Sequence, residues 1–220
     1  MTINETFEIR KAIEKGICYK HTGKMSGMIS YSTSVLNNGN CDKYRNIPGS
    51  VCSHCYAAAQ LSYQDGTAKK AARNTELITK EVYPAECFPQ VNALYFRFEA
   101  FGDINNETQV KNYFKWATVN PHTTFALWTK NAHIIQAAIN DGAIKPENLI
   151  IIYSSLFVND PVHAEIIQKK YSFVDKVFSV YSKDYAEKYH IGINCGGRHC
   201  APCLRCYKKE TETAVSELLK

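Results

Sequence analysis

Seven of the nine cysteines in this sequence fall into two groups that lie far apart along the chain. The front group consists of Cys41, Cys52 and Cys55, and the tail group consists of Cys195, Cys200, Cys203 and Cys206. A chain of 220 residues is too long to depend on disulfide staples. Grouped cysteines in a reducing compartment therefore predict metal or redox chemistry.

The tail group has the spacing C-x4-C-x2-C-x2-C within the string CGGRHCAPCLRCY. Cysteines repeated at two-residue spacing present their thiolates on a tight loop, as the bacterial ferredoxin run does for a 4Fe–4S cluster. Four thiolates also suit a tetrahedral zinc site, although zinc sites usually separate their two cysteine pairs by a longer stretch. The tail group thus predicts a metal site, with an iron–sulfur cluster favoured over zinc.

The front group supplies three thiolates, one fewer than a closed four-ligand site needs. Either His54, Asp42 or a tail cysteine completes the set, or one metal position stays open. A cluster held by three cysteines has one iron free to bind a ligand, which supports chemistry. The two groups predict either two metal sites or one site with ligands from both. Cys18 and Cys87 stand alone and are expected to be ordinary thiols.

Strands and helices that alternate along the chain must position these cysteines. Apolar or alternating runs predict strands at Met28–Thr33, Leu94–Ala100, Thr123–Trp128, Leu149–Ser154 and Lys176–Tyr181. Helical spacing predicts helices at Tyr56–Lys80, Glu107–Asn120, Ala132–Ile139, Pro161–Lys170 and Lys183–His190, with Asp65-Gly66 breaking the first. This alternation predicts an α/β fold with a mostly parallel sheet of five strand–helix units, or six if residues 191–194 add a strand. The sheet is either open and doubly wound or a partial barrel. We expect a main domain over residues 1–190 and a cysteine-rich metal-binding tail, packed on it, over residues 191–220.

Polar side chains follow the ends of the predicted strands. In parallel α/β folds the carboxyl ends of the strands meet at one edge, where ligands bind. Arg97 and Glu99 lie within a strand on a face expected to be interior, and a buried charge needs a partner or a function. The residues that we expect at a candidate active site on this edge are Ser32, Arg97, Glu99, Gly102, Asp103, Lys130, Ser154 and Tyr181.

The composition is that of an ordinary globular chain, with 45% hydrophobic and 21% charged residues. No run of about 18 apolar residues is present, so a membrane span is not expected. The polar start of the sequence lacks the apolar core of a signal peptide, which predicts a cytoplasmic protein. The formal net charge of +5 permits contact with nucleic acid without requiring it.

Several motifs occur in a fixed order along the chain. They are Gly23-Lys24-Met25-x-Gly27-x-x-Ser30 with Asn40-Cys41, Ile47-Pro48-Gly49-x-Val51-Cys52-x-x-Cys55-Tyr56-Ala57, Arg97 with Gly102-Asp103, Trp128-Thr129-Lys130, and the four-cysteine tail. Together these motifs resemble a bacteriophage family, the gene-product-88-like proteins, over about Gly23 to Tyr207. The resemblance implies no particular activity.

The chain is more distantly similar to radical S-adenosylmethionine enzymes, in which a three-cysteine loop follows the first strand of a partial barrel. This resemblance implies a partial (βα)5-6 barrel, a 4Fe–4S cluster on the front group whose open iron binds S-adenosylmethionine, and an auxiliary cluster on the tail group. On this account Arg97, Glu99, Asp103, Lys130 and Tyr181 are expected to be catalytic, and Ser32, Gly102 and Ser154 to bind the cofactor. The chain departs from that superfamily in the gap of ten residues between its first two front cysteines, and in having Phe101-Gly102-Asp103 in place of a glycine-rich motif.

Two functional hypotheses follow from these residues. The first is an iron–sulfur enzyme that uses S-adenosylmethionine and acts on a small molecule or a nucleic acid. The second is a module, stabilised by zinc or a structural cluster, that binds nucleic acid or protein without catalysis. The charged side chains of Arg97 and Glu99 within a strand favour the enzyme. A zinc deaminase ranks last because no His-x-Glu precedes either cysteine pair.

Overall fold

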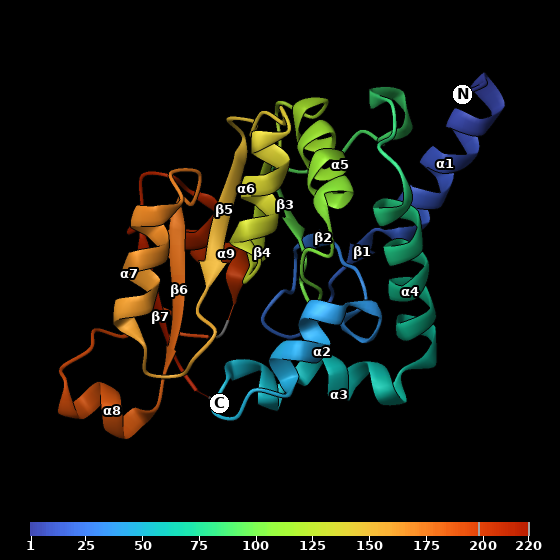
Figure 1. Cartoon of the computed structure of the whole chain (residues 1–220). Coiled ribbons are helices and arrows are strands. Elements are labelled where there is room, and N and C mark those ends of the chain that lie inside the picture. The colour runs from blue at the N-terminus through green and yellow to red at the C-terminus, as the bar shows by residue number, and fades with distance from the viewer. Residues whose placement is uncertain (198, 220) are drawn as a thin grey trace.

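The structure is a computed structural model of the chain and describes residues 1–197 and 199–219 (Figure 1). The strands are β1 (Cys18–Tyr19), β2 (Ile29–Tyr31), β3 (Tyr95–Phe98), β4 (Thr124–Thr129), β5 (Leu149–Ser154), β6 (Lys176–Tyr181) and β7 (Ala214–Leu218). The α-helices are α1 (Ile3–Gly16), α2 (Gly39–Arg45), α3 (Tyr56–Tyr63), α4 (Asp65–Lys80), α5 (Glu107–Thr118), α6 (Ala132–Asn140), α7 (Pro161–Lys170), α8 (Lys183–Lys188) and α9 (Cys200–Cys203). Short 3-10 helices are η1 (Val35–Asn37), η2 (Val51–His54), η3 (Ala85–Cys87) and η4 (Arg205–Tyr207).

The seven strands found in the described residues form one sheet, and their order in the sheet follows the chain from β1 to β7. β1 is antiparallel to β2, whereas each later pair of neighbours is parallel. Each parallel pair needs a crossover; the crossovers between β2 and β6 bring α4, α5, α6 and α7 to the same face, whereas α9, between β6 and β7, lies over the opposite face. The predicted α/β fold with a mostly parallel sheet is therefore confirmed.

One face of the sheet, called the helix face here, packs against α1, α4, α5, α6 and α7 and carries the main core. Its centre is aromatic. Phe98 of β3 stacks on Tyr113 of α5 with ring centroids 4.0 Å apart, and Trp116 packs against both Phe96 and Phe98. Aromatic side chains bury large apolar areas and dominate core energetics. They fix β3, the strand that carries Arg97, firmly against α5.

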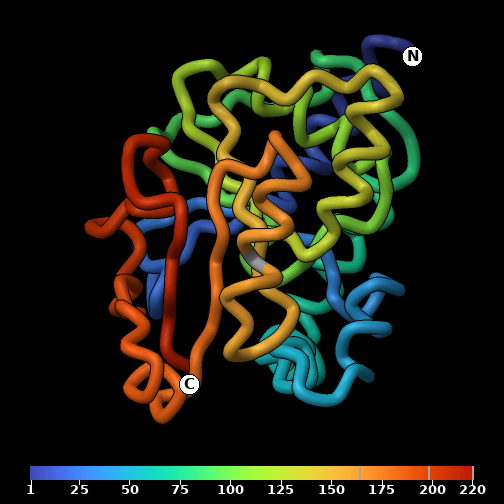
Figure 2. The backbone as a smooth tube through the Cα atoms, turned by 60° about the vertical axis from the view of Figure 1, so that its left-hand side comes forward, coloured from blue at the N-terminus to red at the C-terminus, as the bar shows by residue number. Residues whose placement is uncertain are grey.

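The opposite face, called the tail face here, is covered by residues 199–207. Ala126, Ile150 and Ile152 are buried there together with Tyr207. After this cover the chain returns to the sheet as β7, which pairs with β6 (Figure 2). The sixth strand considered at residues 191–194 is wrong, because those residues form no strand; the sixth parallel strand is β7 at Ala214–Leu218 instead.

Local sequence explains several element boundaries. Thr2 and Glu5 form a capping box at the start of α1. α7 begins with Pro161, and the side chain of Asp160 accepts a hydrogen bond from the backbone N–H of His163. β3 ends at Phe98, earlier than predicted, because Glu99 has a φ of +56° that no strand residue adopts.

None of the helices in the described residues combines the length and the apolar character that crossing a bilayer requires.

Candidate functional site

The loops after β3 and β4 meet at the carboxyl edge of the sheet, and Asp103 joins them. Its buried carboxylate accepts hydrogen bonds from the backbone N–H groups of Ile104 and Lys130 at 2.7 and 3.0 Å, and from the hydroxyl of Thr129 at 2.5 Å. Burial raises the pKa of Asp103, and the positive charge of Lys130 opposes the rise. Asp103 therefore fixes the place of Lys130 at this edge.

Replacing Asp103 with asparagine is expected to lower the free energy of unfolding by about 2 kcal/mol. The carboxylate accepts bonds on both oxygens, so the new NH2 group would face either the backbone N–H of Lys130 or the N–H of Ile104. Urea unfolding followed by circular dichroism measures the loss. Asp141→Asn is the control, because that side chain is 66% exposed and pairs with Lys111 at the surface. Equal stability of Asp103→Asn and wild type would contradict this role.

Glu99 is buried between three elements. Its carboxylate accepts bonds from the backbone N–H of Thr33 at 3.0 Å, from the amide of Gln109 at 2.7 Å and from the hydroxyl of Tyr113 at 2.5 Å. Burial raises the pKa of Glu99 to about 8, although the hydrogen bonds from Tyr113 and Thr33 oppose the rise. Glu99 thus ties the end of β3 to β2 and α5, and a catalytic role for it stays a prediction.

Ser32 and Gly102 pack around this network. The hydroxyl of Ser32 accepts a hydrogen bond from the backbone N–H of Ala100 at 2.9 Å. A Cβ atom at Gly102 would lie 1.8 Å from the Glu99 carboxylate and 2.8 Å from the carbonyl oxygen of Thr33. Both residues support the loop after β3, and cofactor binding by them stays a prediction.

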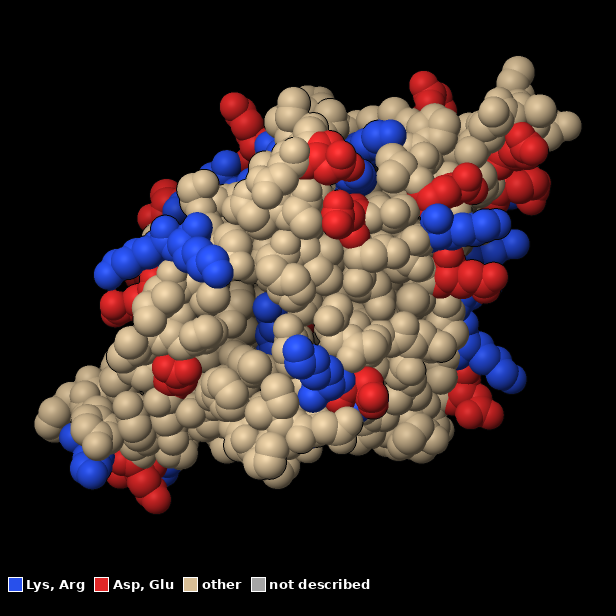
Figure 3. All heavy atoms as spheres, viewed as in Figure 1, with Lys and Arg blue, Asp and Glu red and all other residues tan. Residues whose placement is uncertain are grey.

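Lys130 and Ser154 lie on neighbouring strand ends. The ammonium of Lys130 donates to the hydroxyl of Ser154 at 3.1 Å, and both residues are half-buried. Within the described residues Lys130 forms no ion pair with a carboxylate. Figure 3 shows Lys or Arg atoms deep in a hollow of this face, near the start of α6. Of the predicted site residues, Lys130 and Ser154 are the pair best placed to meet a ligand.

The front group lies on α2, η2 and the turn before α3, below the carboxyl ends of the strands (Figure 1). Three side chains hold this segment to the sheet. Asn38 caps α2, and its side-chain amide donates to the carbonyl oxygen of Asp103 at 2.9 Å. The hydroxyl of Tyr44 donates to the side-chain oxygen of Asn131 at 2.8 Å. The hydroxyl of Tyr56 donates to the carbonyl oxygen of Ala100 at 2.7 Å. The front cysteines are therefore fixed beside the loops after β3 and β4.

The front thiols influence one another electrostatically. Burial raises the pKa of Cys41, and the neighbouring groups Asp103, Cys52 and Cys55 raise it further. Burial also raises the pKa of Cys52, whereas the charge of Lys130 lowers it. The three thiols and Lys130 thus form one neighbourhood at the carboxyl edge.

The tail group lies over the tail face of the sheet. The backbone N–H of Cys200 donates to the carbonyl oxygen of Lys24 at 2.8 Å, and that of Cys195 donates to the carbonyl oxygen of Ser216 at 2.9 Å. Burial raises the pKa of Cys206 to about 12; the charge of Arg97 opposes the rise and the other tail thiols add to it. The segment is tied to β7 at Cys195 and to the turn between β1 and β2 at Cys200, and its four thiols influence one another electrostatically.

Cations surround the tail group. Arg97 lowers the pKa values of both Cys200 and Cys206, and Lys24 lowers that of Cys200. Lys176 is fully buried, and its ammonium donates to the carbonyl oxygens of Thr211 and Glu212, both at 3.1 Å. Neither Arg97 nor Lys176 forms an ion pair with a carboxylate in the part of the chain that the structure describes. Arg97 thus faces thiols, whereas Lys176 is also influenced by the carboxylates of Glu212, Asp175 and Glu210.

In residues 1–197 and 199–219 no three His, Cys, Asp or Glu side chains are placed so that they could hold a metal ion as they lie. Metal binding at either group would therefore need the thiols to move together. Cys18 and Cys87 belong to neither group: Cys87 is fully buried, and Cys18 lies 3.7 Å from the ammonium of Lys70.

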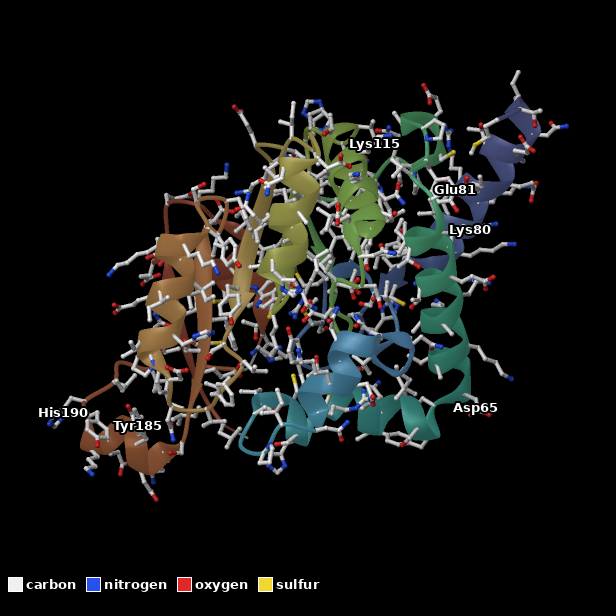
Figure 4. All side chains as sticks on the ribbon, viewed as in Figure 1. Asp65, Lys80, Glu81, Lys115, Tyr185 and His190 are labelled. Carbon is white, nitrogen blue, oxygen red and sulfur yellow. The ribbon has the colours of Figure 1, made fainter. Side chains whose placement is uncertain are left out.

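Tyr181 is separated from the other predicted site residues. It stacks on Tyr185 of α8 with ring centroids 6.1 Å apart. Figure 4 shows Tyr185 and His190 on α8 and just after it, away from α2 and α3. The structure thus joins Asp103, Lys130 and Ser154 by hydrogen bonds, and it leaves Tyr181 with the aromatic side chains of α8.

Sequence reasoning missed the residues that complete both regions. Thr33, Gln109 and Tyr113 bind the Glu99 carboxylate, and no spacing in the sequence marks them. Met25 and Trp128 contact Arg97: the Nη1–Met25 Sδ distance is 3.3 Å, and the guanidinium carbon lies 3.9 Å from the Trp128 ring centroid. Met25 and Trp128 both belong to the motifs that occur in a fixed order along the chain, and this membership was the only sequence signal that could have pointed to them.

An α/β fold with two cysteine groups around one mostly parallel sheet describes the class of this protein. Residues 14–216 match the family described as gene product 88, so the chain belongs to that family. This confirms the bacteriophage family that the motifs predicted. No curated protein and no solved structure matches the chain.

Proposed function

We propose that this chain is an iron–sulfur protein, with a cluster on the tail group and a second, open cluster on the front group. The observation that carries the proposal is the charge around the tail group. Arg97 acts on the thiols of Cys200 and Cys206, its Nε is buried without a hydrogen-bond partner, and it forms no ion pair in the described residues, although a buried cation needs a compensating charge. A metal centre with four thiolate ligands carries a net negative charge and supplies that compensation.

The front group supports an active site. Three thiols lie beside Lys130 at the carboxyl edge of a parallel sheet, where ligands of such folds bind. A cluster there would offer one iron to a substrate or cofactor, with Lys130 and Ser154 at hand to bind it. We take the substrate to be a small molecule or a nucleic acid, and the site of action to be the cytoplasm.

The strand order supports a finer proposal, a partial barrel related to radical S-adenosylmethionine enzymes. Six successive parallel strands, β2 to β7, with α4 to α7 on one face and a three-cysteine segment after β2 match that arrangement. Reduced, reconstituted protein given S-adenosylmethionine should then release methionine and 5′-deoxyadenosine. If protein with its full content of iron and sulfide released neither product, S-adenosylmethionine would be ruled out as a cofactor, and the proposal of iron–sulfur clusters would remain.

Metal content of protein prepared without oxygen tests the main proposal. We expect about four iron and four acid-labile sulfide per cluster. Replacing the four tail cysteines with serine should remove the iron and sulfide bound at the tail group. Replacing the three front cysteines with serine should remove those bound at the front group. Cys18→Ser is the matched control and should keep both. A wild-type chain with no bound metal would overturn the proposal.

Zinc without sulfide would instead favour the second candidate, a metal-stabilised module that binds nucleic acid or protein without catalysis. The tail loop supports this candidate, because four cysteines on a segment bonded to β7 and to the turn between β1 and β2 suit a structural zinc site. Loss of zinc would then lower the thermal stability of the chain.

A further inference from the structure

Three buried polar atoms without a hydrogen-bond partner lie near one another on the tail face: Ser30 Oγ, Arg97 Nε and Tyr207 Oη. Ser30 pairs directly with Arg97 across β2 and β3. The ring of Tyr207 packs against those of Tyr95 and Trp128, each at 5.7 Å between centroids, and the Arg97 guanidinium lies on the Trp128 ring. Buried donors without acceptors are rare in folded proteins, and each needs an explanation.

The positions of these donors relative to the tail group suggest what they bind. Tyr207 directly follows Cys206 in the chain. Cys200 and Cys206 pack in the same cluster as Tyr207, Trp128 and Met25, and Arg97 touches both the Trp128 ring and the sulfur of Met25. No carboxylate reaches Arg97 within the described residues. The groups packed around these donors therefore include the sulfur atoms of Cys200, Cys206 and Met25, and the Tyr207 hydroxyl itself interacts with Arg97.

We propose that Arg97 and Tyr207 donate hydrogen bonds to the sulfur atoms of a metal centre on the tail group, with Ser30 beside them. This inference rests on the proposed function and gives Arg97 a role different from the substrate contact that the sequence predicted. Hydrogen bonds and positive charge next to a thiolate centre stabilise its more reduced, more negative form and slow the loss of metal. Arg97 is thus a positioning residue of the tail centre.

The test compares Arg97→Gln, Arg97→Lys and Tyr207→Phe with wild-type protein prepared without oxygen. The readouts are the rate at which metal passes to a chelator, which applies to iron and zinc alike, and the reduction potential where iron is bound. We expect Arg97→Gln to lose metal about ten times faster than wild type and to have a lower potential. Tyr207→Phe, which removes only a hydroxyl, should shift both quantities in the same direction by less. Arg97→Lys should lie between Arg97→Gln and wild type.

Arg73→Gln is the matched control, because Arg73 is exposed on α4 and its loss should leave both readouts unchanged. A variant in which the three front cysteines are replaced with serine holds only the tail centre. Its rate of metal loss and its reduction potential therefore report on the tail centre alone. Wild-type rates and potentials in both Arg97→Gln and Tyr207→Phe would overturn this inference while leaving the metal centre in place. A wild-type tail that binds no metal would overturn the proposed function and this inference together.

Discussion

Replacing Gly102 with alanine is expected to destabilise the protein by about 3 kcal/mol or more. The new Cβ atom would lie 1.8 Å from Glu99 Oε2 and 2.5 Å from the hydroxyl oxygen of Thr33. Glu99 cannot turn aside, because Thr33, Gln109 and Tyr113 hold its carboxylate in a buried position. The loop after β3 must therefore shift, and Asp103 and Lys130 shift with it. Thermal and urea unfolding of the purified variant measure the loss.

Gly66→Ala is the matched control for this experiment. Gly66 lies in α4, and a Cβ atom there would meet no other atom within 4 Å. Alanine should stabilise that helix by about 0.5–1 kcal/mol relative to glycine. If Gly102→Ala unfolded at the same urea concentration as wild type, the close packing of Gly102 against Glu99 would be wrong.

Glu99 is expected to make the stability of the protein fall as pH rises through neutrality. Its pKa in the folded chain is raised from 4.5 to about 8 by burial. A raised pKa means that the folded state holds the proton more tightly than the unfolded state, so this contribution is fully present below pH 4.5 and is lost as pH rises to about 8. At 1.36 kcal/mol for each pKa unit, the loss between pH 5 and pH 8 is about 4 kcal/mol.

Glu99→Gln should remove this pH dependence, since the amide keeps the shape of the side chain and carries no titrating proton. Urea unfolding at several pH values between 5 and 8.5 measures the difference between variant and wild type. Glu76→Gln, an exposed change on α4, should follow the wild-type profile. Parallel profiles for Glu99→Gln and wild type would show that the Glu99 carboxyl titrates alike in the folded and unfolded chain.

The central strands and helices were predictable because local signals were strong. β5 and β6 have the predicted bounds, since each is a largely apolar run that ends in hydroxyl side chains. α7 also has the predicted bounds, because Pro161 starts it and the lysines at 169 and 170 end it. Buried parallel strands leave this kind of pattern in any sequence.

The edges of the sheet were not predictable in the same way. β1 has two residues, and Val215 is the one buried residue of β7, so neither strand carries an apolar run. α1 was missed although Thr2 and Glu5 form a readable capping box. The predicted helix over residues 56–80 is two helices that divide at Gln64, one residue before the expected break.

The position of the candidate site at the carboxyl edge of the sheet was predictable from the sequence, but the contacts between its side chains were not. Residues at strand ends do converge, as Asp103, Lys130 and Ser154 show. Arg97 and Glu99 were expected on one face because strands alternate, but the positive φ of Glu99 turns its side chain into the network of Thr33 and Tyr113. A single backbone angle separated the two charges, and no sequence pattern reports such an angle.

The connection from β6 to β7 has a consequence for how the sheet assembles. The two strands pair in parallel from Val177 with Ala214 to Tyr181 with Leu218, and the four tail cysteines all lie in the connection between them. Bringing the ends of a long flexible loop together costs entropy that grows with its length. Metal held by the tail group would divide this connection into shorter loops, so that closure of the last strand pair would follow metal loading. Cofactor assembly and completion of the sheet would then be one cooperative event.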